Sequence, residues 1–459
     1  MARRNLTTHS TGARIALLLC ARLEYICGSP RPVNSGVGRL AVNCLVSEMI
    51  DERYNPTFIA DVAGSVLSDE LGEEIRLQAG ETFITDGSVV VRCKVIDCGS
   101  NLPASIIVKK TREDEFGYHP DSSETPNSAH WLFSDWAAAE FLGSVPSDVP
   151  FSPKLYGGSR ELGLIILEDL GDGEQPNTYD ALLANDPQLA EQTLIEHVSL
   201  IGQLHAATIG RDEEYRRIRK SLGALPKPEK LFQDPWADAR NHPLQASEIE
   251  EAIKLYRTVF ENLGIRAETD VADEIEFIAS AVEARPKQFL AFCKGDQNAA
   301  GDYIRQDSKP RLFDFGASGF RHALVEGMPA RFTWGCMMQI PKRIKPLMDA
   351  PYKAQLMKKH PEITDEVFKR AMIEAGARWH IFHVVHRLPD ALSGDRQRGL
   401  TTLRQQTFAW LMAFADLYEE LDCLQALGVS ARRIVERLRN LWSVDVCALP
   451  YYPAFRNEG

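Results

Sequence analysis

Two aspartates near residue 300 have the type and spacing that a phosphate reaction requires. Asp296 follows Gly295 after the apolar run 289–292, where a predicted strand opens into a loop. Asp314 begins the run Asp314-Phe315-Gly316 a short distance along the chain. The segment 303–313 predicts two short apolar strands joined by a polar turn. A hairpin of that size would return the second aspartate close to the first.

A pair of carboxylates held in this way suits phosphoryl transfer from a nucleotide. Asp296 would orient the acceptor hydroxyl and take its proton. Asp314 would bind Mg²⁺ on the nucleotide phosphates, since a hard cation prefers carboxylate oxygens. Either aspartate alone could be a turn former, but the two at this spacing, after a β-rich segment, favour the catalytic interpretation.

A lysine in that β-rich segment is placed to reach phosphate oxygens. Lys109 ends a run of β-branched residues, so its ammonium emerges at the edge of a sheet. It would need an acid on a nearby helix, and Asp135 and Glu140 are the candidates. The alternatives are that Lys109 is a solvated strand-end lysine, or that Lys110 is the true ligand.

The run Leu167-Glu168-Asp169-Leu170 ends an apolar strand and leads into a glycine-ended connection. A linker between a sheet and a helical part can offer backbone N–H and C=O groups to an adenine edge. A plain strand-to-helix turn is the alternative interpretation.

Two groups of histidines are better explained by packing than by chemistry. His205 lies on the apolar stripe of a predicted helix over 187–207, which indicates a core histidine that supports the catalytic loop. His380, His383 and His386 recur every three residues, whereas a zinc site prefers histidines at i and i+4. Their apolar neighbours favour a packed helix.

The order of predicted elements indicates three parts. Residues 1–55 form an N-terminal extension, residues 56–170 a nucleotide-binding N-lobe, and residues 171–459 a helical C-lobe with the catalytic loop, metal site and substrate pocket. The N-lobe pattern is a small antiparallel sheet with a helix after its second predicted strand. The predicted strands and helix cover 88–98, 104–109, 131–145, 154–157 and 162–167. A long buried helix is predicted over 407–427.

Composition limits the possible partners. The 459-residue chain has 44% hydrophobic and 25% charged residues, as in ordinary globular proteins, and its net charge of −12 argues against a nucleic-acid partner. The apolar run 15–21 is too short to span a membrane. The arginine-bearing leader could be an organelle transit peptide, but a disordered or spurious extension upstream of Met49 is favoured. The nine cysteines form no Cys-x-x-Cys pair, so reduced thiols and a cytoplasmic location are expected.

In the order of these motifs the chain resembles the aminoglycoside phosphotransferase/choline kinase-like family of small-molecule kinases, from about residue 68 to residue 330. The resemblance is carried by Val108-Lys109, the helix 135–142, Leu167-Glu168-Asp169-Leu170, Leu204-His205-Ala206, Gly295-Asp296 and Phe313-Asp314-Phe315-Gly316. It implies an α+β, bilobal, protein-kinase-like fold, with a small antiparallel-sheet N-lobe and a large, mainly helical C-lobe.

The resemblance also implies roles, carried over by position. Lys109 would hold the α- and β-phosphates with Asp135 or Glu140 as its partner, and Asp296 would be the catalytic base with Asp314 as the metal ligand. The residues that would border the adenine are Leu167, Glu168 and Leu170.

Three positions depart from the family pattern. Lys294 stands where the family usually has histidine, and Gly301 stands where it has a metal-binding asparagine, so that Asp302 or Asn298 would take over the second metal position. The acid that would pair with Lys109 falls on Asp135, which is shorter than the usual glutamate.

Together these observations predict an O-phosphotransferase that uses ATP or GTP with Mg²⁺. Its partner would be a small hydroxylated molecule, such as an aminoglycoside, choline or another metabolite, with no nucleic acid and no membrane. The alternative is a nucleotide-binding pseudokinase that acts as an interaction or regulatory module, which the altered second metal position favours.

Overall fold

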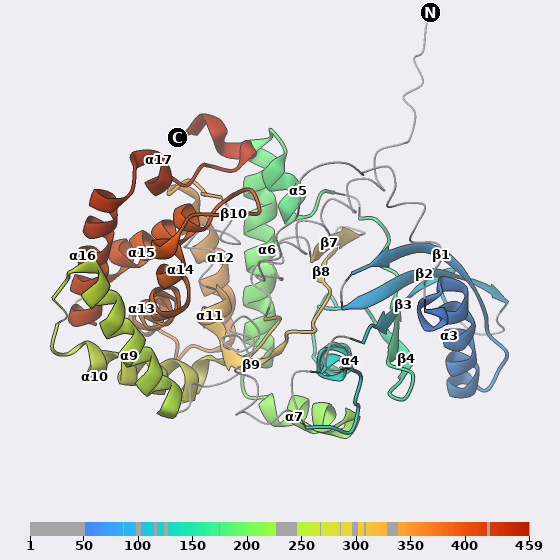
Figure 1. Cartoon of the computed structure of the whole chain (residues 1–459). Coiled ribbons are helices and arrows are strands. Elements are labelled where there is room, and N and C mark those ends of the chain that lie inside the picture. The colour runs from blue at the N-terminus through green and yellow to red at the C-terminus, as the bar shows by residue number, and fades with distance from the viewer. Residues whose placement is uncertain are drawn as a thin grey trace, which may run out of the picture. The chain divides into compact units, whose positions relative to one another are not determined.

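The computed structural model describes residues 51–458 except 86, 98–101, 114–116, 124–126, 174, 226–245, 267, 285, 296–301, 307–308, 328–337 and 420–422. The described chain divides into two compact units. The first contains residues 51–132 and 154–169, and the second contains residues 133–153 and 170–458 (Figure 1). The predicted extension 1–55 lies largely outside the described residues.

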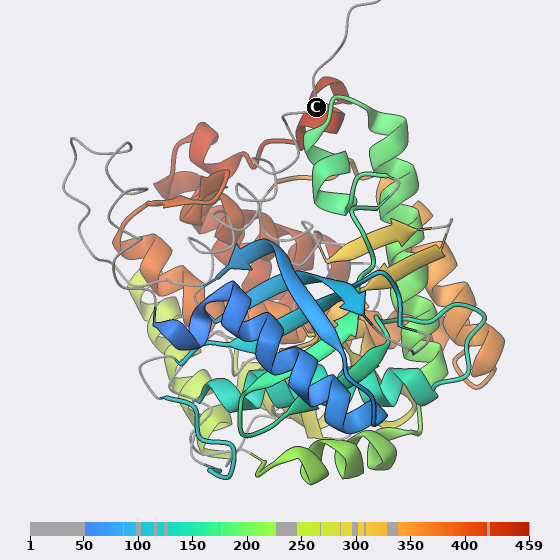
Figure 2. The same cartoon turned by 90° about the vertical axis from the view of Figure 1, so that its right-hand side faces the viewer.

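The first unit is a five-stranded antiparallel sheet with one long helix on it. The strand order is β1-β2-β3-β5-β4. The strands are β1 (Arg76–Ile84), β2 (Ser88–Asp97), β3 (Ser105–Thr111), β4 (Leu155–Ser159) and β5 (Leu164–Glu168), preceded by the short 3₁₀ helix η2 (Glu52–Tyr54) and by α3 (Pro56–Leu71). Figure 2 shows α3 lying across the strands.

Local sequence explains where α3 begins and ends. The Asn55 side chain accepts a hydrogen bond from the Thr57 N–H, and Pro56 occupies the first turn, where its missing N–H costs nothing. Gly72 ends the helix in the left-handed conformation, at φ 71°. Ile59, Ala63 and Leu67 then bury one face against the sheet.

Alternation along β3 decides where its lysines point. Ile106 and Val108 are buried in the core under α3, so Lys109, between Val108 and Lys110, points to the opposite face. Lys109 pairs with Ile165 on β5 and with Val90 on β2.

The second unit is mainly helical. Its helices are α4 (Ser128–Ser144, whose first residues belong to the first unit), α5 (Thr178–Leu183), α6 (Pro187–Thr208), α7 (Asp212–Leu222), α9 (Ala246–Leu263), α10 (Val271–Ile278), α11 (Ala323–Gly327), α12 (Ile344–Lys359), α13 (Asp365–Phe382), α14 (Leu388–Ser393), α15 (Leu403–Tyr418), α16 (Gln425–Leu441) and α17 (Val444–Cys447). Shorter turns are the π-helical η4 (Ala279–Ala284) and η8 (His383–Arg387) and the 3₁₀ helices η5 (Lys287–Phe289) and η9 (Pro453–Glu458).

Three two-stranded sheets interrupt these helices. They pair β6 (Leu290–Cys293) with β9 (Gly319–His322), β7 (Tyr303–Gln306) with β8 (Lys309–Leu312), and β10 (Gln397–Arg398) with β11 (Thr401–Thr402). The predicted α+β class, with a small antiparallel sheet followed by a mainly helical part, is confirmed.

Helix α6 is central to the second unit. Its predicted apolar stripe is buried throughout, at Leu194, Val198, Ile201 and His205, and the helix packs along α12 (Figure 1). The two helices can approach this closely because residue 202 is glycine. A Cβ at Gly202 would lie only 3.0 Å from the backbone of Tyr352. The predicted helix over 187–207 is therefore confirmed.

The triple-histidine segment packs as predicted. His380 stacks on Phe414 with ring centroids 4.7 Å apart, and His383 stacks on Trp410 at 4.6 Å. Burial lowers the pKa of His380 to about 3, so its ring is neutral at physiological pH.

The predicted helix over 407–427 is wrong in extent. Helix α15 ends at Tyr418, and α16 begins at Gln425, after Leu424 adopts a positive φ of 54°. The apolar pattern alone cannot show this break, because both helices bury apolar faces: the Tyr418 ring fills the space that a Cβ at Gly428 would need.

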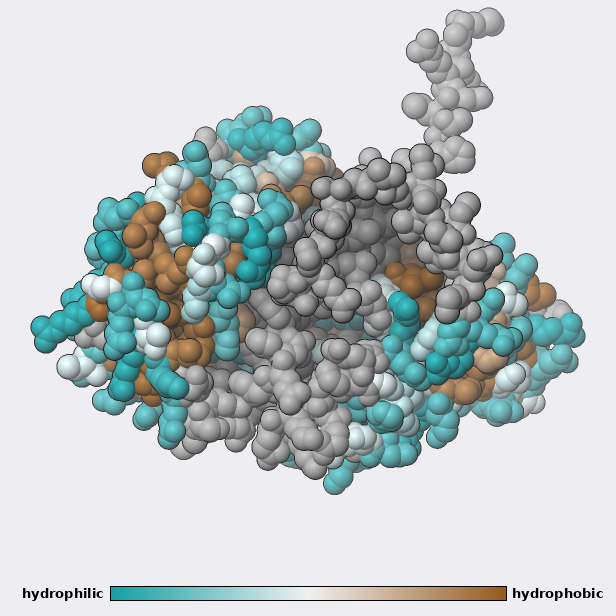
Figure 3. Space-filling view, viewed as in Figure 1, coloured by the Kyte–Doolittle hydropathy of each residue, from teal (hydrophilic) through white to brown (hydrophobic). Residues whose placement is uncertain are grey.

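One face of the described residues is mixed in character (Figure 3). Hydrophilic residues and small hydrophobic patches alternate on the face shown in Figure 3, as on most protein surfaces. Within the described residues, no helix combines the length and apolarity needed to span a bilayer.

Candidate active site

The predicted hairpin near residue 300 exists. Strands β7 and β8 pair Tyr303 with Leu312 and Ile304 with Arg311. At the open end of the hairpin the Phe313 N–H donates to the Asp302 carbonyl at 3.1 Å. Asp302 and Asp314 are therefore brought to the same end of one hairpin. The expected base Asp296 and the alternative metal ligand Asn298 lie outside the described residues.

The turn at Asp314 is held by a side chain from α4. Asp314 adopts a positive φ of 61°, which an L-residue other than glycine rarely does. The next residue, Phe315, donates its N–H to Oδ1 of Asp135 at 2.9 Å. Asp135 is 3% exposed, whereas Glu140 on the same helix is exposed. Asp135, one of the two acids predicted to pair with Lys109, therefore fixes the backbone beside Asp314.

A buried glutamate fixes the start of the loop that carries Asp296. Glu326, on α11, accepts hydrogen bonds from the backbone N–H of Gly295 at 2.7 Å and of Lys294 at 3.0 Å. Its Oε2 is also 2.8 Å from Nε2 of His205, whose Nδ1 is 2.7 Å from the Tyr352 hydroxyl. Through Glu326, His205 therefore supports the backbone of residues 294 and 295, which leads into the loop predicted to be catalytic.

Glu326 is ionised despite its burial. Removal from water would raise the pKa of its carboxyl group, but the hydrogen bond and charge of His205, the Gly295 N–H and the Arg321 charge lower it to about 2. Sequence reasoning missed this residue. The available signal was a single acid inside the otherwise apolar and small run Ala-Leu-Val-Glu-Gly at 323–327.

Gly295 occupies a position that only glycine can fill. Its φ is 94°, and a Cβ there would lie 1.9 Å from the carbonyl oxygen of Ala317. The chain therefore passes directly over the backbone just before Asp296, which restricts the direction in which the loop leaves β6.

Lys294 and Asp302 form a buried ion pair across the ends of the same loop. Nζ of Lys294 is 2.7 Å from Oδ2 of Asp302, and their side chains are only 3% and 5% exposed. Beside the pair, Tyr303 stacks on His197 with centroids 5.0 Å apart. Burial, and then the Lys294 charge, lower the pKa of His197 to about 3, so that His197 is neutral.

The expected nucleotide-binding residues of the first unit lie on neighbouring strands. Lys109 on β3 pairs with Ile165 on β5, and further along the same strands Ile107 pairs with Leu167 and Ile106 with Glu168. The Glu168 carboxylate accepts a hydrogen bond from the Lys154 N–H at 3.1 Å. Leu170, at the start of the second unit, is buried.

Lys110 is engaged elsewhere. Its ammonium donates to the Leu162 carbonyl and lies 5.9 Å from the centre of the Tyr54 ring. Both lysines thus have distinct places in the sheet, and Lys109 is the one on the face opposite α3.

His205, Cys293 and Glu326 have the composition of a metal site, with donor atoms within 4.8 Å of one another. The hydrogen bonds around them do not fit a metal, because both Glu326 oxygens already accept backbone N–H groups. Burial also raises the pKa of the Cys293 thiol well above its usual value, which opposes the thiolate that a metal requires.

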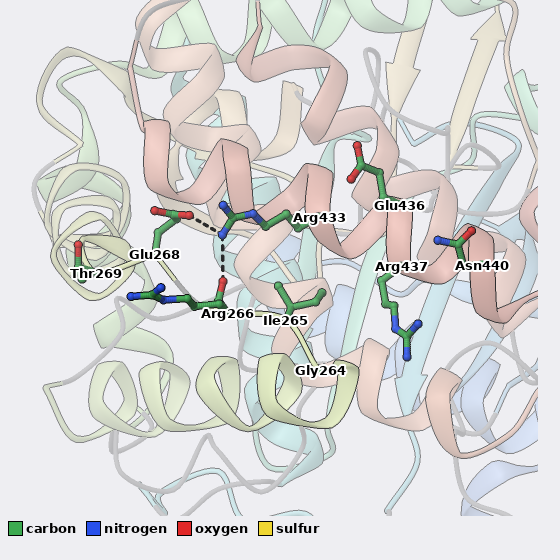
Figure 4. A pocket seen from close by; sticks show the side chains of 9 residues that line it. All are labelled: Gly264, Ile265, Arg266, Glu268, Thr269, Arg433, Glu436, Arg437 and Asn440. Atoms are coloured by element: carbon green, nitrogen blue, oxygen red, sulfur yellow. Dashed lines mark hydrogen bonds and ion pairs between the residues drawn. The ribbon is translucent and has the colours of Figure 1, made fainter.

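A pocket of about 560 Å³ lies between the C-terminal end of α9, the following loop and α16. Figure 4 shows Arg433 of α16 directed at Glu268 and at the Arg266 carbonyl. Its lining contains none of the predicted site residues.

No family model and no curated protein matches the sequence. The structure is similar to solved structures that are kinases or phosphotransferases by name. The choline kinase of Cryptosporidium parvum Iowa II has 11% identity and a TM-score of 0.42, with 82% of this chain and 100% of that chain covered. The Plasmodium vivax ethanolamine kinase has 12% identity and a TM-score of 0.40, with 87% of this chain and 98% of that chain covered. The streptomycin–ATP complex of APH(2")-IIa has 12% identity and a TM-score of 0.39, with 77% of this chain and 99% of that chain covered.

Proposed function

We propose that the protein is an ATP-dependent O-phosphotransferase that transfers the γ-phosphate to a hydroxyl group of a small molecule. The observation that carries this proposal is the construction around residues 294–315. Glu326 holds the backbone that leads into Asp296, and the β7–β8 hairpin returns the chain to Asp314 beside Asp302. A carboxylate base and a carboxylate metal ligand in this order are what phosphoryl transfer needs.

The roles of the residues follow from their chemistry. Asp296 orients the acceptor hydroxyl and takes its proton. Asp314 is half-buried at the end of a fixed turn, which suits a carboxylate that binds Mg²⁺. The metal supplies neutralisation of the nucleotide phosphates when it is bound. Lys109 adds a fixed positive charge for the α- and β-phosphates.

The segment 167–170 supports nucleotide binding in a different way. Leu167 and Glu168 end β5, and Leu170 begins the longer segment of the second unit, so backbone groups of this connection would face the edge of a purine. ATP and GTP differ at that edge, and a competition assay with the two nucleotides would show which one the connection selects.

Turnover can be tested with the purified chain, Mg²⁺-ATP and a library of hydroxylated metabolites and aminoglycosides. We expect ATP consumption that depends on one library member and disappears in Asp296→Ala. Asp61→Asn, at an exposed position of α3, is the matched control and should retain activity. Dependence on a library member that survives in Asp296→Ala would exclude Asp296 as the base.

The second candidate is a nucleotide-binding pseudokinase. The specific observation in its favour is that Asp302, a candidate second metal ligand, is paired with Lys294. This candidate predicts that ATP raises the melting temperature of the protein while no library member causes turnover. Turnover that Asp296→Ala abolishes excludes it.

A further inference from the structure

The environment of Asp302 bears on how many metal ions the proposed nucleotide site takes, and this inference rests on the proposed function. In the protein-kinase type of phosphoryl transfer, two Mg²⁺ ions are held, one by the aspartate of the Asp-Phe-Gly run and one by a polar residue of the catalytic loop. Here Asp314 supplies the first position. The second metal position would fall at residue 301. Asp302, which follows it directly at the end of the loop, is the nearest described carboxylate along the chain.

Asp302 does not fit a magnesium ion as the structure stands. Its Oδ2 is 2.7 Å from the Lys294 ammonium. Mg²⁺ needs carboxylate oxygens at about 2.0–2.1 Å in near-octahedral geometry, and it holds its remaining waters firmly. A divalent ion and an ammonium group on one buried carboxylate would repel each other strongly at separations of about 4 Å. Lysine and metal are therefore alternatives at this carboxylate.

The structure holds both members of the ion pair in place. The backbone N–H of Lys294 is bonded to Glu326, as is that of Gly295. The Asp302 carbonyl accepts the Phe313 N–H, and the next residue, Tyr303, is 2% exposed. Because both backbones are held by hydrogen bonds and both side chains are buried, the ion pair is fixed from both sides.

We propose that the Lys294 ammonium takes the place of a second magnesium ion, so that this chain binds its nucleoside triphosphate with a single divalent cation, on Asp314. The fixed positive charge stabilises the loop end at Asp302 in the absence of nucleotide. The second metal position is thus permanently occupied by a group of the protein itself.

The test counts divalent ions directly. Mn²⁺ replaces Mg²⁺, and electron paramagnetic resonance follows its binding to the full chain with a saturating non-hydrolysable ATP analogue. We expect one Mn²⁺ per wild-type chain and two in Lys294→Met, which leaves the Asp302 carboxylate without the ammonium group. Lys309→Met, at an exposed lysine of β8, is the matched control and should bind one.

Two Mn²⁺ ions in the wild type would overturn the proposal, and so would a single ion in a folded Lys294→Met variant, because Asp302 would then offer no metal position. If Lys294→Met does not fold, Lys294→Gln provides the same test with a neutral donor toward Asp302. Adding Asp302→Asn to either variant should return the count to one. No bound Mn²⁺ at all would overturn the proposed function as well, so the two failures are distinguishable.

Discussion

Replacing Glu326 by glutamine should release the start of the catalytic loop while preserving the size of the side chain. Glu326 accepts hydrogen bonds from Gly295 and Lys294 and is close to His205. An amide group has only one oxygen to accept with, and its NH₂ group must face at least one of these donors. At least one buried backbone N–H then loses its acceptor.

The size of the effect follows from the pKa of Glu326. Folding lowers it from 4.5 to about 2, so the folded protein favours the charged form by roughly 3 kcal/mol at 1.36 kcal/mol for each pKa unit. Glutamine resembles the uncharged form, so Glu326→Gln should lower the free energy of unfolding at pH 7 by about 3 kcal/mol. Loss of one hydrogen bond to a charged group, about 1.5–3 kcal/mol, gives a similar figure.

Two measurements test this prediction. Urea denaturation gives the change in the free energy of unfolding, and hydrogen exchange reports the N–H groups of Lys294 and Gly295. We expect faster exchange at these two positions in Glu326→Gln and no change in Glu362→Gln, whose side chain is 57% exposed. A stability within about 0.5 kcal/mol of the wild type, with unchanged exchange, would refute the role assigned to Glu326.

Three further predictions concern other parts of the structure. Gly295→Ala should lower the free energy of unfolding by about 3 kcal/mol or more, measured by urea denaturation, since its Cβ would overlap the Ala317 carbonyl. Asp314→Asn should fold normally, because asparagine tolerates the left-handed conformation, yet should weaken Mg²⁺-dependent nucleotide binding in calorimetry by about tenfold or more. His380 has a pKa of about 3 when folded and 6.5 when unfolded, so between these values the unfolded state binds an extra proton and stability falls as the pH falls. In His380→Phe, the slope of the unfolding free energy against pH, measured by urea denaturation between pH 6 and pH 4, should therefore be smaller by about 1.4 kcal/mol per pH unit. An unchanged slope would contradict a neutral, buried ring.

Features set by neighbouring residues could be predicted from the sequence. The β7–β8 hairpin follows from two short apolar runs around a polar turn, and α6 follows from a stripe that repeats at helical intervals. The packing of His380 and His383 follows from their apolar neighbours. For the hairpin and for α6, the pattern and the structure that it specifies lie in one short stretch of chain, and for the histidines the apolar neighbours in sequence predict burial but not the partners Phe414 and Trp410.

The contacts that build the site join distant residues and could not be predicted in this way. Asp135 and Phe315 are 180 positions apart, and Glu326 and Gly295 are 31 apart. A lone acid in an apolar run gives no sign of which N–H groups it will meet. Strand β1 was missed for another reason: most of its residues are exposed or only half-buried, so it lacks the strict alternation that indicates a strand.

Lys294 connects two supports of the catalytic loop that are otherwise independent. Its backbone N–H is bonded to Glu326, and its ammonium is bonded to Asp302, eight residues further along the chain. The beginning and the end of the loop around Asp296 are therefore joined through one residue. A histidine at this position has a shorter side chain, and its charge near neutral pH depends on its surroundings, whereas lysine reaches further and remains charged. Under the proposed single-metal site, Lys294 and Gly301 belong together, because the Lys294–Asp302 ion pair would supply the charge and the closure that a second metal ion would otherwise give. The departures at positions 294 and 301 are therefore compatible with the proposed catalytic role of the loop, because both of its ends are held in place.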